Sequence, residues 1–169
     1  MKLYMQQKVF TWRDKFTVKD ETGADCYYVE GELISLGKKL HIYDKNHSEA
    51  ALVRQKFITL LPRYYVEMGG REVCQVAKKL TLFKPKYDLV GLGWQVSGDF
   101  WAHEYTLRDG DKTVMQVSKR WVSWGDSYEL DIADASNATL CLAVVLAIDA
   151  AVEATQNAID SSNATPSTK

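Results

Sequence analysis

Asn137-Ala-Thr-Leu-Cys-Leu-Ala-Val-Val-Leu-Ala-Ile-Asp149 contains an unbroken apolar run from Leu140 to Ile148. Because a helix formed by this run has no polar face, it must be covered on every side. The run is too short to cross a bilayer, which takes about 20 apolar residues, and Asp149 ends it. Since the preceding region has the alternating pattern of β-strands, the sequence predicts a β-sheet wrapped around this helix.

The region before the helix predicts twelve strands, because short pieces of alternating apolar and polar residues are separated by turn signals. Six are expected near Leu3–Val9, Lys15–Lys19, Cys26–Leu33, Leu40–Asp44, Ala50–Phe57 and Arg63–Met68. Six more are expected near Glu72–Leu80, Tyr87–Val90, Gly93–Ser97, Trp101–Arg108, Thr113–Trp121 and Ser127–Ile132. Glycine-containing pieces between them, including Ser97-Gly98-Asp99, predict tight hairpin turns.

The two sets of strands are related by a shift of 64 residues, which places Val53–Leu60 on Val117–Trp124 and Tyr64 on Tyr128. Shared strand patterning without duplication is the alternative explanation. A duplicated six-stranded unit that closes on itself removes exposed sheet edges. We therefore expect a mainly β fold: a closed or nearly closed antiparallel barrel of two similar halves, enclosing the C-terminal apolar helix.

The chain of 169 residues suits one domain, with two small domains as the alternative. We expect this domain to span residues 1–156. Ser136 or Asn137 can cap the start of the helix, and the helix can continue past Asp149 to Ala154. The remaining residues, 157–169, are small and polar and predict a disordered tail.

Charge and cysteine content restrict the class of protein. The net charge of −1 gives no overall attraction to nucleic acid, so no nucleic-acid partner is expected. Cys26, Cys74 and Cys141 are odd in number and widely spaced, which favours free thiols in a reducing compartment. The N-terminal residues lack the apolar stretch of a secretory signal. The sequence thus predicts a cytoplasmic protein without a transmembrane segment.

Four stretches resemble the LURP-one-related family, including its YxjI-like bacterial members. They are Arg54–Tyr65, Lys78–Lys86, Gly98–Tyr105 and Lys119–Asp131, and Trp121–Asp126 is the most specific part. The resemblance covers about Leu3 to Ala154. It implies the fold of the tubby C-terminal domain and of phospholipid scramblases, a twelve-stranded barrel around a central apolar helix.

The resemblance also implies a ligand, because tubby-like domains bind phosphoinositide head groups through surface basic residues. That family's Lys/Arg pair does not match this sequence residue by residue. The richest local basic cluster, and hence the candidate ligand-binding patch, consists of Lys78, Lys79, Lys84 and Lys86 around Pro85. Such a patch can hold a multivalent phosphate. The alternative is a solvated strand edge that lysines protect against aggregation.

No arrangement of residues demands an enzyme. His41, His47 and His103 do not have the spacing of a metal site, so we expect structural histidines. Glu129 and Asp131 share one strand face, but the repeat suggests that one acidic position belongs to the scaffold. We predict no catalytic, cofactor-binding or metal-binding residue. A helix in the lumen also leaves no deep cavity for a cofactor.

Asp149 is unfavourable at the C-terminal end of a helix dipole, so we expect a cation or hydrogen-bond donor beside it at the barrel mouth, with exposure to water as the alternative. The favoured function is a non-catalytic cytoplasmic binding domain, peripheral to a membrane, that engages phosphoinositide or other anionic lipid head groups. The alternative is a protein-interaction or structural scaffold domain. Scramblase activity is the least favoured interpretation, because the apolar helix is expected to be enclosed.

Overall fold

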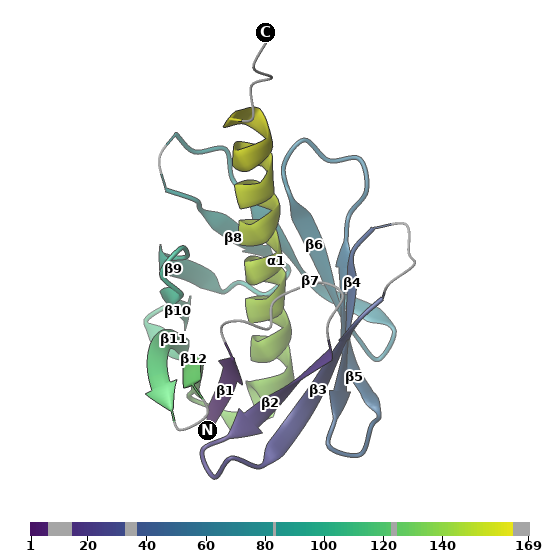
Figure 1. Cartoon of the computed structure of the whole chain (residues 1–169), viewed down its shortest axis with the longest axis vertical. Helices are drawn as coiled ribbons and strands as arrows, with labels where there is room; N and C mark the ends of the chain where they lie inside the picture. Colours follow the sequence, from purple (N-terminus) through teal and green to yellow (C-terminus); the bar gives the residue numbers. More distant parts are fainter. Residues whose placement is uncertain (7–14, 33–36, 83, 123–124, 164–169) are drawn as a thin grey trace, which may run out of the picture.

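A computed structural model of the chain describes residues 1–6, 15–32, 37–82, 84–122 and 125–163. It contains twelve strands and one long helix (Figure 1). The strands of the first half are β1 (Lys2–Gln6), β2 (Lys15–Asp20), β3 (Asp25–Gly31), β4 (Lys39–Asp44), β5 (Glu49–Gln55) and β6 (Arg63–Met68). Those of the second half are β7 (Arg71–Lys78), β8 (Tyr87–Val90), β9 (Gln95–Asp99), β10 (Glu104–Asp109), β11 (Lys112–Val122) and β12 (Gly125–Ile132). The 3-10 helix η2 (Ala135–Asn137) leads into α1 (Ala138–Asn163).

The strands form one antiparallel sheet in the order β8-β7-β6-β5-β4-β3-β2-β1-β12-β11-β10-β9. Consecutive strands pair from β1 to β8 and from β9 to β12, and β1 joins the halves by pairing with β12. Within the described residues no backbone ladder joins β8 to β9, so the barrel is nearly closed and has a seam there. The connection across the seam contains Gly91 and Gly93 at φ of 102° and 70°, which glycine adopts without steric cost.

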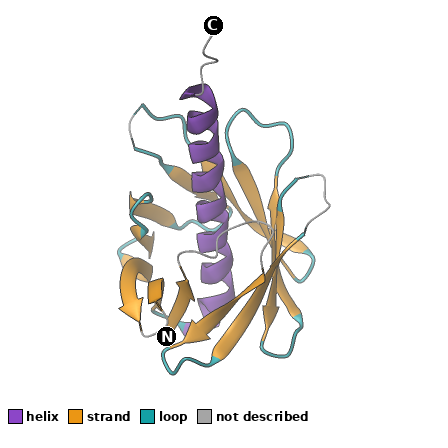
Figure 2. Ribbon diagram, in the orientation of Figure 1, coloured by secondary structure: helices purple, strands orange, loops and turns teal. Residues whose placement is uncertain are grey.

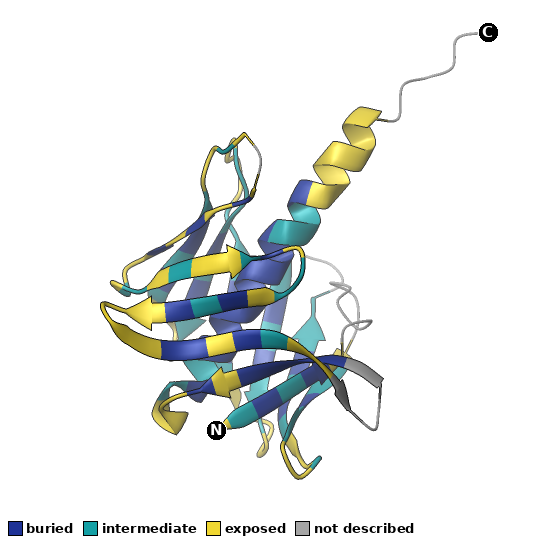
Figure 3. Cartoon of the chain, turned by 90° about the vertical axis from the view of Figure 1, so that its left-hand side faces the viewer, coloured by how far each residue is buried: buried dark blue, intermediate teal, exposed yellow. Residues whose placement is uncertain are grey.

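The helix lies inside the sheet, as Figures 2 and 3 show. Every residue from Cys141 to Ala151 is buried. Strand residues alternate around it, for example Leu40 and Ile42 of β4, which face the core and are buried. By length and composition the segment Ala135–Asn163 could span a membrane, but 72% of its most apolar window is buried within the protein. Enclosure therefore accounts for the apolar run, and the twelve-stranded barrel with a central helix is confirmed.

The predicted repeat has a structural counterpart at the helix. Tyr64 of β6 and Tyr128 of β12, which the 64-residue shift relates, are both fully buried. The Tyr64 hydroxyl donates to the carbonyl oxygen of Ala150 at 3.2 Å, and the Tyr128 hydroxyl donates to Oδ2 of Asp149 at 3.2 Å. Equivalent strands of the two halves thus contact neighbouring residues of α1.

The helix α1 begins at Ala138, next to the predicted start, but it ends later than predicted. The predicted caps, Ser136 and Asn137, belong to η2, and Asp134 caps this turn by accepting from the Ser136 backbone N–H at 2.9 Å. At the other end, residues 157–163 are helical rather than disordered. Side chains there satisfy backbone groups of the last turns, since Ser161 Oγ donates to the Asn157 carbonyl oxygen at 2.7 Å. Residues 164–169 of the predicted tail lie outside the described residues.

A turn near the seam also differs from the prediction. Ser97-Gly98-Asp99 is not the hairpin turn but the end of β9, and the strand expected from Trp101 begins at Glu104. The Asp99 carboxylate accepts from the backbone N–H groups of Trp101 and Ala102, both at 3.1 Å. This Asx turn moves the reversal of the chain beyond Asp99.

Candidate functional site

A cleft of about 440 Å³ lies at the seam between β8 and β9. Lys79, Lys84 and Lys86 of the connection between β7 and β8 lie at its rim, and Tyr87 and Phe100 are buried at its base. Alternate N–H and C=O groups of β8 and β9 point away from β7 and β10, with which these strands pair in the described part of the chain. The cleft therefore combines ammonium groups, backbone polar groups and aromatic rings.

The rim lysines are accessible to a ligand. Lys79 Nζ lies 2.7 Å from Oδ1 of Asp88, with both side chains about half exposed, and Lys84 Nζ lies 3.7 Å from Oδ2 of Asp99. Lys86 is exposed and has no ion pair with a described residue. Exposed ion pairs of this kind contribute about 0–1 kcal/mol. A phosphate can therefore replace either carboxylate at little cost.

Lys78, the fourth lysine of the predicted patch, lies outside the cleft. Its backbone N–H donates to the Pro62 carbonyl oxygen at 3.0 Å, and its side chain lines a second crevice, of about 300 Å³, beside the end of α1. Burial lowers the pKa of Lys78. The structure thus brings three of the four predicted lysines together, and Trp94 also lines their cleft.

A buried polar cluster lies behind the base of the cleft. Phe100 packs edge-on against Tyr87, with ring centroids 4.8 Å apart, and its ring is tilted against that of Tyr105, with centroids 5.1 Å apart. The pKa values of Tyr105 and Tyr128 are raised well above the ordinary tyrosine value, mainly by burial and next by the negative charge of the nearby Asp149. Both tyrosines therefore remain neutral hydrogen-bonding groups at physiological pH.

Asp149 is in the interior of the barrel and not at its mouth, because α1 continues beyond it. The Tyr128 hydroxyl is the donor that the sequence led us to expect. His103 Nδ1 lies 3.4 Å from the other carboxylate oxygen, and the His103 ring stacks on Tyr128 with centroids 4.4 Å apart. Asp149 therefore links the central helix to β12 and to the turn before β10.

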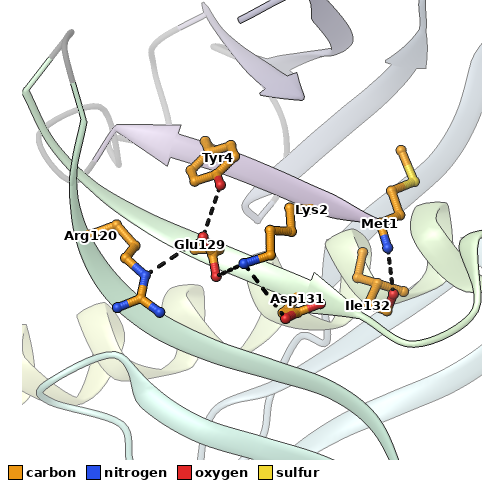
Figure 4. Close-up of polar contacts among 7 residues, drawn as sticks. All are labelled: Met1, Lys2, Tyr4, Arg120, Glu129, Asp131 and Ile132. Carbon is orange, nitrogen blue, oxygen red and sulfur yellow. Dashed lines mark hydrogen bonds and ion pairs between the residues drawn. The ribbon is translucent and has the colours of Figure 1, made fainter. Parts of the chain in front are cut away.

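A second polar cluster lies where β1, β11 and β12 meet (Figure 4). The Glu129 carboxylate accepts from Lys2 Nζ and from the Tyr4 hydroxyl, both at 2.9 Å, and lies 3.6 Å from Arg120 Nε. Burial opposes ionisation of Glu129, but these contacts outweigh it and lower its pKa. Lys2 also lies 3.8 Å from Asp131. These contacts join β1 of the first half to β11 and β12 of the second half.

The three histidines contact different partners. His41 Nδ1 lies 2.6 Å from Oε2 of Glu49, His47 stacks on Tyr28 with centroids 4.5 Å apart, and His103 contacts Asp149. Among the described residues no group of three or more His, Cys, Asp or Glu side chains is placed to hold a metal ion. These contacts are those of structural side chains.

The three cysteines are unbridged, and Cys74 and Cys141 are buried. Burial raises the pKa of each of these two thiols to about 12. Since the thiolate is the reactive form of cysteine, both are expected to be inert.

Comparison with known proteins identifies the relatives of the chain. A family model described as LURP-one-related matches residues 1–149. The chain is 41% identical over 149 residues to the uncharacterized protein YxjI of Bacillus subtilis (strain 168), covering 88% of this chain and 92% of that protein. The X-ray structure of a protein from Arabidopsis thaliana is similar with a TM-score of 0.60 and 15% identity, over 88% of this chain and 90% of that chain. The first two findings confirm the family resemblance, and the third supports the tubby-like fold.

Proposed function

Since the chain belongs to the LURP-one-related family, we propose that it is a non-catalytic cytoplasmic binding domain whose seam cleft binds the phosphorylated head group of an anionic lipid. The observation that carries this proposal is the position of Lys79, Lys84 and Lys86 around one cleft. Its volume of about 440 Å³ is within the range of small-molecule sites, about 300–1,000 Å³. A phosphoinositide head group, with several phosphates on one small ring, fits both the size and the charge.

The binding mode follows from the present contacts of the lysines. Phosphate oxygens would replace Asp88 at Lys79 and Asp99 at Lys84, and Lys86 would bind without losing an ion pair with a described residue. Each charged hydrogen bond formed in this partly shielded place is worth about 1.5–3 kcal/mol. The half-buried Trp94 on the wall can pack against the ring of the head group.

Vesicle flotation tests this proposal. Phosphatidylcholine vesicles with a phosphoinositide should recover more protein than phosphatidylcholine alone, and Lys84→Glu with Lys86→Glu should remove the difference. The matched control is Lys45→Glu with Lys112→Glu, because both residues are exposed, lie outside the cleft and give the same change in net charge. Equal recovery from both kinds of vesicle, unaffected by the cleft variant, would rule out the proposal.

A protein-interaction domain is the second candidate, because the free edges of β8 and β9 could each pair with an extended peptide. A bound strand would protect the outward N–H groups of both edges from hydrogen exchange. A head group held only by lysine side chains would leave these amides unchanged. Exchange measured with and without a soluble inositol phosphate and with a candidate partner therefore separates the two functions.

A further inference from the structure

Two neighbouring connections expose large apolar side chains to solvent. In the β5–β6 connection, Ile58 and Leu60 are 104% and 100% exposed, and in the β7–β8 connection, Leu80 and Leu82 are 86% and 93% exposed. We call these four residues the apolar tips. Scattered single apolar residues are normal on a surface, but a group of large ones marks a contact site.

The two connections lie at the end of the barrel from which α1 emerges (Figure 1). Their bases are joined by the hydrogen bond from the Lys78 N–H to the Pro62 carbonyl oxygen. Leu60, Lys78 and Ile159 of α1 line one crevice of about 300 Å³, so the apolar surface continues onto the helix. Ile159 is itself 43% exposed.

One of the apolar tips, Ile58, also has an unusual backbone conformation. Its φ of 52° lies in the left-handed region, which is a genuine outlier for a β-branched residue. Such strain persists where the surrounding structure imposes it, and it is frequent at functional sites. The strain at Ile58 and the full exposure of its side chain together indicate a residue that a binding partner covers.

The charges around the apolar tips indicate what that partner is. Residues 56–63 and 78–86 contain six basic residues and no acidic one. Apolar side chains surrounded by lysine and arginine suit an anionic bilayer, where tips enter the acyl region and cations face the head groups. A protein partner would more commonly be received in a groove, but the tips are nearly fully exposed on protruding connections.

We infer that the apolar tips insert into an anionic phospholipid bilayer and bring the seam cleft to the level of the head groups. Lys84 and Lys86, which line the cleft, follow the tips Leu80 and Leu82 in the same connection. The inference rests on the proposed function for the cleft ligand, and it makes that ligand a lipid in a membrane rather than a free phosphate compound.

Two paired variants test the insertion. Ile58→Gln with Leu60→Gln, and Leu80→Gln with Leu82→Gln, remove apolar area without changing charge. Each pair should weaken partition to phosphatidylcholine–phosphatidylserine vesicles about tenfold or more, because binding scales with buried apolar area. Binding of soluble inositol trisphosphate should not change. Trp101→Gln is the matched control, since Trp101 is an exposed apolar residue outside both connections.

A depth measurement gives an independent test without removing apolar area. Leu82→Trp should show extra fluorescence quenching, relative to the parent protein, on vesicles with acyl-brominated lipids. Partition of the Gln pairs equal to the parent, with no added quenching, would overturn the inference.

The two assays separate the two proposals. Binding of inositol trisphosphate without vesicle binding would refute insertion and support the cleft. Vesicle binding that depends on the tips, without inositol trisphosphate binding, would support insertion and refute the cleft. A dimer in analytical ultracentrifugation that both Gln pairs abolish would also overturn the inference, since the tips would then contact a second copy.

Discussion

Replacing Leu146 by Ala tests the enclosure of the central helix. Leu146 is fully buried, and residues on both sides of it, from Cys141 to Ala151, are buried too. Because the surrounding sheet is hydrogen-bonded through twelve strands, the site cannot collapse freely onto the cavity. We therefore expect a loss in the upper part of the usual range for Leu→Ala, about 3–5 kcal/mol of unfolding free energy.

Urea denaturation followed by circular dichroism measures this loss. The midpoint temperature should also fall by about 6–20 °C, since 1 kcal/mol corresponds to about 2–4 °C in a domain of this size. Ile159→Ala on the exposed part of α1 is the matched control and should cost less than about 1 kcal/mol. Equal and small losses for Leu146→Ala and Ile159→Ala would refute the enclosure of the helix.

Two further predictions concern the sheet. The pKa of Glu129 is lower in the folded state than in the unfolded state, so its ionised carboxylate stabilises the fold at pH values above the unfolded-state pKa of about 4.3. This stabilisation is lost as the pH falls through the folded-state pKa. Glu129→Gln should thus lower the denaturation midpoint at pH 7, and the difference from the parent should vanish in acid; a difference independent of pH would contradict this account. Gly98→Ala should cost about 2 kcal/mol or more of unfolding free energy, because Gly98 has a φ of 144° and an added Cβ would lie 2.4 Å from the Glu104 carbonyl oxygen. A thermal melt of the Ala variant that matches the parent would show that β9 can shift to admit the side chain.

The parts of the fold that sequence predicted well are those with a local signal. The apolar run Leu140–Ile148 has no polar face, so its burial could be predicted without knowing its neighbours. The alternation of apolar and polar residues placed the twelve strands to within a few residues. The register between strands could not be predicted in the same way, because it depends on pairing between segments that are distant in the sequence. The seam between β8 and β9 therefore had no clear local signal beyond the glycines of the connection.

Local side-chain contacts account for the boundaries that were missed. Asp134 caps η2 and Asp99 forms the turn before β10, but aspartate is common in both roles and its position alone cannot decide between them. The end of α1 was missed because small polar residues resemble a linker in composition. Their hydrogen bonds to the preceding turn are seen only once the helix exists.

The candidate site was predicted in part. Lys78, Lys79, Lys84 and Lys86 were grouped because they are close together in sequence. The last three line the seam cleft, whereas Lys78 lines the second crevice. Lys78 is the last residue of β7, whereas the other three lysines lie in the connection to β8. The exposure of the apolar tips was not predicted, because the hydrophobicity of a residue does not show whether its side chain is exposed.

The order of elements along the chain has a consequence for biosynthesis. During translation all twelve strands leave the ribosome before α1, yet α1 supplies the surface on which their apolar faces pack. The terminal ammonium of Met1 and the carbonyl oxygen of Ile132, which form a hydrogen bond of 2.9 Å, are also separated by nearly the whole series of strands. The nascent sheet thus exposes apolar surface until the helix is made. The barrel therefore cannot be completed before α1 has been synthesised, although α1 is the last element in the order.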